Sequence, residues 1–237
     1  MRGIGQRVSG SEYRPAWVRS DVPQGVQADQ FLHAYYYNVV REGHHYRYLE
    51  FYERNKNNPE GALKEALKWW KSLSSAPTEE DITIYQWSPY LRNHLSKERV
   101  TGLSQEEFRE VCKRIFAMRD HSLRVTNETY GLPRGTPPKE REECIELLAS
   151  YLWKQRTDSG KNVLEVIYHV LYAGAQAEVP LRLWEATNTS KWQLHHVGIS
   201  SLGETVGWAM PNAFPPRNGR SSKALRALGY NVTIHSE

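Results

Sequence analysis

Long apolar runs and cysteines are both scarce in this chain. No stretch reaches the roughly 18 apolar residues of a membrane-spanning helix, and the N-terminal sequence MRGIGQRVSGSEYRP lacks the apolar core of a signal peptide. Cys112 and Cys144 are the only cysteines, which are too few for a disulfide framework or an all-cysteine zinc site. We therefore expect a cytoplasmic protein whose two thiols are buried and reduced.

Complete catalytic motifs are also missing. Ser159-Gly160-Lys161 is similar to the end of a P-loop, but Gln155 stands where that loop requires glycine and Asn162 where it requires Ser or Thr. The metal-binding patterns HExxH and CxxC are absent, and so is the nucleophile motif GxSxG. The sequence therefore predicts no catalytic residue, no metal and no cofactor, and it favours a protein that is not an enzyme.

Strand patterns are rare, whereas helical spacing of apolar residues recurs along the chain. ITIYQW at residues 82–87 is the only tempting alternating run. Ser104 and Glu107 form a capping box ahead of an apolar helical series. Helices are also expected over about 139–155 and 161–172. The predicted fold class is mainly α and multi-helical, with two helical subdomains and little or no sheet.

Breaks in the pattern suggest how the chain is divided. Residues 1–24 are rich in Gly, Ser, Arg and Pro and predict an irregular N-terminal arm. An aromatic-rich helical domain is expected over 25–130. The segment YGLPRGTPPKE at 130–140 then marks a boundary, because it holds two glycines and three prolines. A second helical domain, ending in a hairpin-like module, is expected over 139–237.

Aromatic residues are abundant, with 8 Trp and 14 Tyr in 237 residues. Those between residues 31 and 70 exceed what one small core must hold, so we expect an aromatic surface that contacts a protein partner. The residues are Tyr35, Tyr36, Tyr37, Tyr46, Tyr48, Tyr52, Trp69 and Trp70.

A few polar groups could carry chemistry. His44-His45 and His195-His196 are adjacent pairs, which on a helix would point about 100° apart and chelate one ion poorly. Asp120-His121 would form a catalytic pair only if a nucleophile faced it. Glu204 could join His195 or His196, but it also forms a capping box with Ser201. Surface and capping roles are therefore preferred for these groups.

The run PNAFPPRNGRSSKALRALGY at residues 211–230 is the most distinctive in the chain. The double proline enforces extended backbone, Gly219 gives a turn, Ser221 or Ser222 caps the last helix, and Gly229 ends it. Cations then recur at every third position, as Arg217, Arg220, Lys223 and Arg226. Such a slanting stripe beside a helix N-terminus suits phosphate, although a solvated or acid-paired basic face would have the same pattern.

The longer run VGISSLGETVGWAMPNAFPPRNGRSSKALRALGY resembles the helix-hairpin-helix region of the DNA glycosylase superfamily. It is also similar to helical modules of McrB-like restriction and defence proteins. In glycosylases the hairpin binds phosphate through backbone N–H groups, which implies contacts near Gly198 to Ser201. The chain departs at Ser200, where a second glycine is expected, and at Asn218, where the catalytic aspartate is expected. Because an amide cannot act as a general base, the resemblance implies DNA contact without glycosylase chemistry.

The leading hypothesis is a non-enzymatic DNA-binding or adaptor protein in a prokaryotic defence or mobile-element system, with no membrane partner. The predicted nucleic-acid-binding residues are Gly198, Ser200, Ser201, Arg217, Asn218, Arg220, Ser221, Lys223 and Arg226. One alternative is a nuclease or base-excision enzyme that uses the polar groups above. The other is a protein-interaction subunit of a larger complex.

Overall fold

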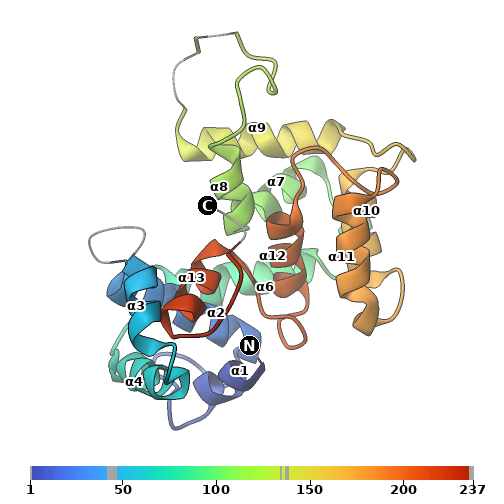
Figure 1. The fold of residues 1–237 in the computed structure, drawn as a ribbon. Helices are drawn as coiled ribbons and strands as arrows, with labels where there is room; N and C mark the ends of the chain where they lie inside the picture. The colour runs from blue at the N-terminus through green and yellow to red at the C-terminus, as the bar shows by residue number, and fades with distance from the viewer. Residues whose placement is uncertain (1, 42–46, 134, 137–138, 235–237) are drawn as a thin grey trace. The chain divides into compact units, whose positions relative to one another are not determined.

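The computed structural model describes residues 2–41, 47–133, 135–136 and 139–234 (Figure 1). All regular secondary structure in these ranges is helical and no strand occurs, which confirms the mainly α fold class. The tempting run ITIYQW is helical as well, because it lies across α5 (Glu80–Ile82) and the π-helix η2 (Thr83–Trp87). None of the described helices combines the length and apolar character needed to cross a membrane.

Contacts divide the chain into two compact units. Unit 1 comprises Met1–Pro89 and Met210–Glu237, and unit 2 comprises Tyr90–Ala209. This division differs from the expected one, because the segment 130–140 is irregular but lies inside unit 2. The C-terminal segment belongs to the same unit as the N-terminal residues because the apolar face of its helix, Gly219–Ala227, packs on helices formed by the N-terminal residues.

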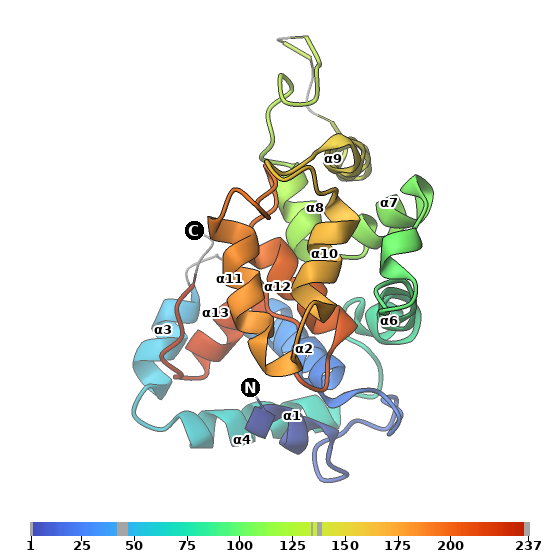
Figure 2. The same cartoon turned by 90° about the vertical axis from the view of Figure 1, so that its right-hand side faces the viewer.

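Unit 1 is built around one buried helix. The elements of this unit are α1 (Arg2–Ser9), α2 (Gln24–Tyr35), the π-helix η1 (Tyr36–Val40), α3 (Arg47–Asn55), α4 (Pro59–Ser72), α5, η2 and α13 (Gly219–Ala227). Every residue of α2 from Gly25 to Tyr35 is buried. α13 packs on α2 and α3, and Figures 1 and 2 show it beside both.

The N-terminal arm is not irregular throughout, contrary to the prediction. Arg2–Ser9 forms α1, which packs on α2 and buries Ile4 and Val8. Two apolar residues four positions apart on one helical face were enough for this packing.

Unit 2 holds the remaining helices. α6 (Ser88–His94) begins in unit 1 and ends in unit 2. The helices that follow it are η3 (Val100–Gly102), α7 (Gln105–Lys113), α8 (Phe116–Ser122), α9 (Arg141–Lys154), α10 (Val163–Tyr172), η4 (Gln176–Glu178), α11 (Val179–Asn188) and α12 (Ile199–Ala209). The predicted capping box of Ser104 and Glu107 begins α7. Cys112 and Cys144 are both buried free thiols.

Candidate nucleic-acid interface

The N-terminus of α13 is capped by Asn218. Its Oδ1 accepts from the backbone N–H groups of Arg220 and Ser221, each at 3.0 Å. Ser221 Oγ in turn accepts from Asn218 N at 3.1 Å. The expected cap at Ser221 or Ser222 is therefore wrong, because the helix begins at Gly219. These two amides already have an acceptor, so the helix N-terminus offers less to a phosphate than the sequence suggested.

The C-terminus of α13 is fastened to α3. Gly229 has a φ of 95°, and a Cβ there would lie 2.4 Å from the carbonyl oxygen of Asn55. Gly229 N donates to Arg226 O at 2.9 Å and Tyr230 N to Leu225 O at 3.1 Å, the bonds of a Schellman cap. Asn55 Nδ2 donates to Ala227 O at 2.8 Å. The predicted role of Gly229 as the helix end is confirmed.

The cation stripe of α13 lies over aromatic rings. Arg220, Lys223 and Arg226 are half-buried. Their charged groups lie 5.8 Å from the ring centre of Tyr37, 5.6 Å from that of Tyr48 and 3.9 Å from that of Tyr52, respectively. The spacing of three places all three cations on the side of α13 that packs on α3 and η1. Arg217 precedes the helix and is exposed.

Arginines close in sequence to these tyrosines also lie over aromatic rings of residues 37–52. Arg41 lies 5.2 Å from the ring centre of Tyr37, and Arg47 and Arg54 lie 5.5 and 4.1 Å from that of Phe51. We call this arrangement the basic–aromatic face. It consists of the rings of Tyr37, Tyr48, Phe51 and Tyr52 and the cations Arg41, Arg47, Arg54, Arg220, Lys223 and Arg226. A cation held over a ring keeps N–H groups that can bind phosphate oxygens.

The aromatic surface expected for a protein partner is mostly core. Tyr35, Tyr36, Tyr48 and Trp70 are all buried, because they fill the space around α2. Tyr37, Tyr52 and Trp69 remain half-exposed. Tyr46 lies outside the described residues, as do His44 and His45.

The other half of the predicted hairpin module belongs to unit 2. Gly198 precedes α12, Ser200 and Ser201 lie in its first turn, and α12 packs on α8, α10 and α11. α13 packs instead on elements of unit 1. The nine predicted residues are thus divided, with Gly198, Ser200 and Ser201 in one unit and the other six in the other.

Glu204 is a structural residue of unit 2. It is fully buried, and its Oε1 accepts from Phe116 N at 3.0 Å and from Trp208 Nε1 at 3.1 Å. Its Oε2 accepts from Ala117 N at 2.8 Å. The carboxylate therefore caps α8 rather than its own helix, so the predicted capping box with Ser201 is wrong.

His121, His195 and His196 form a cluster in unit 2. Adjacency in the sequence predicted only the pair His195 and His196. His121 Nε2 lies 3.1 Å from His196 Nδ1, and His195 Nδ1 lies 2.9 Å from the hydroxyl of Tyr151. His196 has a φ of 64°, and its Nε2 is buried without a hydrogen-bond partner in the described part of the chain. Asp120 lies 3.6 Å from Arg141. Within the ranges that the structure describes, no three His, Cys, Asp or Glu residues are placed to hold a metal ion.

The histidine cluster predicts a loss of stability in mild acid. Burial lowers the pKa of both His121 and His196, and the neighbouring cationic or imidazole groups lower it further. When the pH falls below about 6.5, the ordinary histidine pKa, these histidines become protonated in the unfolded chain but stay neutral in the folded protein. The free energy of unfolding therefore falls as the pH falls. We expect urea unfolding of the protein to shift to lower urea between pH 7 and pH 5.

A His196→Asn variant tests this origin, because asparagine tolerates a positive φ. The stability of this variant should depend less on pH than the parent's does between pH 5 and pH 7. Above pH 7 the two proteins should show the same pH dependence. Some dependence should persist, because burial also lowers the pKa of His169. Equal slopes for the two proteins between pH 5 and pH 6.5 would rule out the cluster as the cause.

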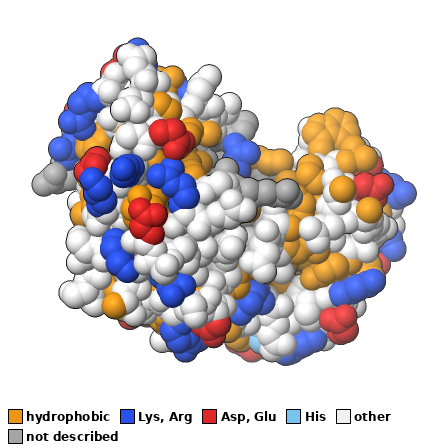
Figure 3. All heavy atoms as spheres, turned by 90° about the horizontal axis from the view of Figure 1, so that it is seen from below, with side chains coloured by type: hydrophobic (Ala, Val, Ile, Leu, Met, Phe, Trp, Pro, Cys, Tyr) orange, Lys and Arg blue, Asp and Glu red, His pale blue; other side chains and the backbone are white. Residues whose placement is uncertain are grey.

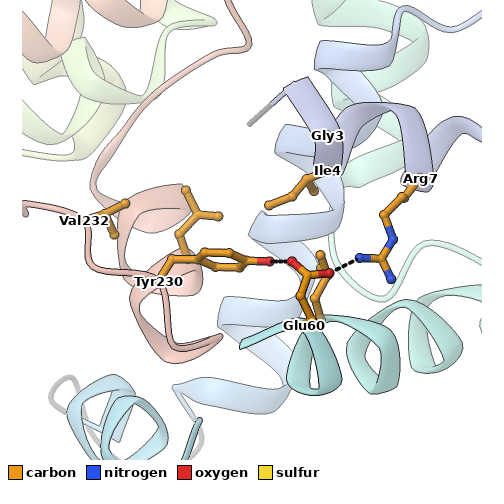
Figure 4. Close-up of a pocket in the computed structure, with 8 residues that line it drawn as sticks. Gly3, Ile4, Arg7, Glu60, Tyr230 and Val232 are labelled. Carbon is orange, nitrogen blue, oxygen red and sulfur yellow. Dashed lines mark hydrogen bonds and ion pairs between the residues drawn. The ribbon is translucent and has the colours of Figure 1, made fainter. Parts of the chain in front are cut away.

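A pocket of about 400 Å³ lies beside the C-terminal segment of unit 1 (Figure 4). Its polar edge is Glu60, which accepts from Arg7 Nη1 at 2.8 Å and from the Tyr230 hydroxyl at 2.9 Å. Ile4, Leu63, Leu225 and Val232 form apolar parts of its lining. Both oxygens of Glu60 are thus used to join α1, α4 and the segment after α13, which is a structural role.

Charge on the surface is mixed. Figure 3 shows Lys and Arg spread over the visible face with Asp and Glu among them. The net charge is only +4. Attraction of an anionic partner must therefore come from a local cluster of cations rather than from the field of the whole protein.

No family model, curated protein or solved structure matches this chain. The resemblance to the helix-hairpin-helix region and to McrB-like modules therefore stays a prediction.

Proposed function

We propose that this protein binds DNA non-covalently through the basic–aromatic face of unit 1. The observation that carries the proposal is the collection of six cations over four rings on η1, α3 and α13. Phosphates bind to Arg and Lys with release of counterions, and rings and guanidinium planes accept stacked bases. The cations of the face offer the first kind of contact, and the half-exposed rings of Tyr37 and Tyr52 offer the second.

Several of these cations are available to a ligand. Arg41, Arg54, Lys223 and Arg226 form no ion pair with an acid among the residues described. The rings hold the side chains in place, which reduces the entropy lost when they bind a phosphate. Arg217 extends the positive charge beyond the start of α13.

Removal of two of these charges tests the proposal. We expect an Arg217→Gln, Lys223→Gln double variant to weaken DNA binding and to reduce the slope of log K against log salt by about 2 on duplex DNA. Fluorescence anisotropy with a labelled oligonucleotide at four salt concentrations measures both quantities. Glutamine keeps the aliphatic packing over Tyr48 better than a reversed charge would.

The matched control is an Arg92→Gln, Lys97→Gln variant, which removes two exposed cations from unit 2. It should bind as the parent does. The proposal is wrong if the parent shows no salt-dependent binding, or if the control loses as much affinity as the Arg217 and Lys223 variant.

A further inference from the structure

A second groove in unit 1 is lined by residues of α3 and α4. It has a volume of about 530 Å³, and its lining includes Tyr35, Phe51 and Trp69. Residues of α2, η1, α3 and α4 all contribute to it. A space of this size is within the range of small-molecule binding sites.

The polar groups of the groove are mainly unused hydrogen-bond donors. Arg54 lies over Phe51 without an acidic partner in the described chain. The hydroxyl of Tyr35 and the Nε1 of Trp69 make no hydrogen bond with any residue that the structure describes. Burial raises the pKa of Tyr35 to about 12, so its hydroxyl remains a donor at neutral pH.

Two of the side-chain acceptors of the groove are occupied, whereas Asn55 Oδ1 and the second oxygen of Glu65 accept no hydrogen bond from the residues described. Glu65 accepts from Lys68 Nζ at 2.8 Å, and Asn58 Oδ1 accepts from Gly61 N at 3.0 Å. Free donors of Arg54, Tyr35 and Trp69 lie beside aromatic surface, so the groove suits a flat ligand that has acceptors for them and a phosphate near Arg54. A nucleobase with its adjoining phosphate has these properties.

The groove adjoins the proposed DNA-binding surface. Phe51 and Arg54 line the groove and also belong to the basic–aromatic face, and Tyr52 follows directly in α3. We infer that the groove holds one unstacked base of single-stranded DNA whose neighbouring phosphates lie on that face. This inference rests on the proposed function and predicts a preference for single strands, because bases in a duplex are paired and stacked.

The test separates base contacts from phosphate contacts. Binding is measured by anisotropy for oligo(dT), for an abasic strand with the same number of phosphates, and for a duplex. Trp69→Ala should weaken binding of oligo(dT) about tenfold, as the loss of one stacked base does, and leave the abasic strand unaffected. Trp184→Ala, which removes an exposed tryptophan of unit 2, is the matched control.

A second variant guards against a folding defect. Tyr35→Phe removes only the hydroxyl and should weaken binding of oligo(dT) about threefold to fivefold, again without an effect on the abasic strand. Circular dichroism checks that both variants keep the parent's helix content. The parent could bind all three probes strongly and in a salt-dependent way while neither variant weakens binding of oligo(dT) more than binding of the abasic strand. In that case the groove does not hold a base, and the DNA-binding proposal stands. If the parent binds none of the probes, both fail.

Discussion

Replacement of Glu204 with glutamine is expected to destabilise unit 2 by about 3 kcal/mol. The carboxylate accepts three hydrogen bonds, two of them from the backbone N–H groups that begin α8. An amide presents one oxygen and one NH₂ group, so at least one buried N–H would face another donor. A buried donor without a partner costs about 1–3 kcal/mol, and loss of the negative charge at the start of a helix adds to this.

Urea unfolding measures this loss, and hydrogen exchange of α8 and α12 localises it. Glu142→Gln is the control, because the Glu142 carboxylate is exposed and pairs with Arg119, and its loss should cost less than about 1 kcal/mol. The outcome also bears on the enzyme hypothesis. If Glu204→Gln kept the parent's stability but abolished a DNA cleavage activity, Glu204 would be a catalytic residue and its assignment as a cap would be wrong.

Replacement of Gly25 with alanine is expected to destabilise unit 1 by about 3 kcal/mol. A Cβ at this position would lie 1.8 Å from the carbonyl oxygen of Pro211 and 2.7 Å from its carbonyl carbon. Both partners are backbone atoms, so no change of rotamer relieves the clash. Either α2 or the C-terminal segment must move, and the position of α13 over α3 depends on both.

The control is Gly3→Ala in α1, where an added Cβ meets no atom within 4 Å. That change should be neutral or slightly stabilising, because alanine favours a helix by up to about 1 kcal/mol over glycine. Reduced protection of α2 and α13 in hydrogen exchange, together with weaker DNA binding, would support this account. Equal stability of the two alanine variants would show that the contact between Gly25 and Pro211 does not constrain the fold.

Local patterns predicted much of the helical structure. The capping box at Ser104, the helix expected over about 139–155 and the end of α13 at Gly229 each depend on a few neighbouring residues. All are observed, the helix as Arg141–Lys154. Glu204 shows the opposite case. Its sequence spacing matched a local cap, yet its partners Phe116 and Ala117 lie far away along the chain.

The candidate site was predicted only in part for the same reason. The stripe of Arg220, Lys223 and Arg226 was visible in the sequence, because it depends on helical spacing alone. Its rings were not, since Tyr37, Tyr48 and Tyr52 come from a segment 174 to 183 residues earlier. The meeting of His121 with His196 was missed because the two are 75 positions apart.

The sequence by itself determined that this chain is helical, where several helices begin and end, and which face of the last helix carries its charge. Those properties follow from backbone hydrogen bonds and side chains within about four residues of each other. The tertiary structure alone decided that the C-terminal helix packs with the N-terminal ones and that its cations lie over tyrosines. It also decided that Glu204 caps α8. Such choices depend on which apolar surfaces bury one another, and that pairing is not encoded in the spacing of any single segment.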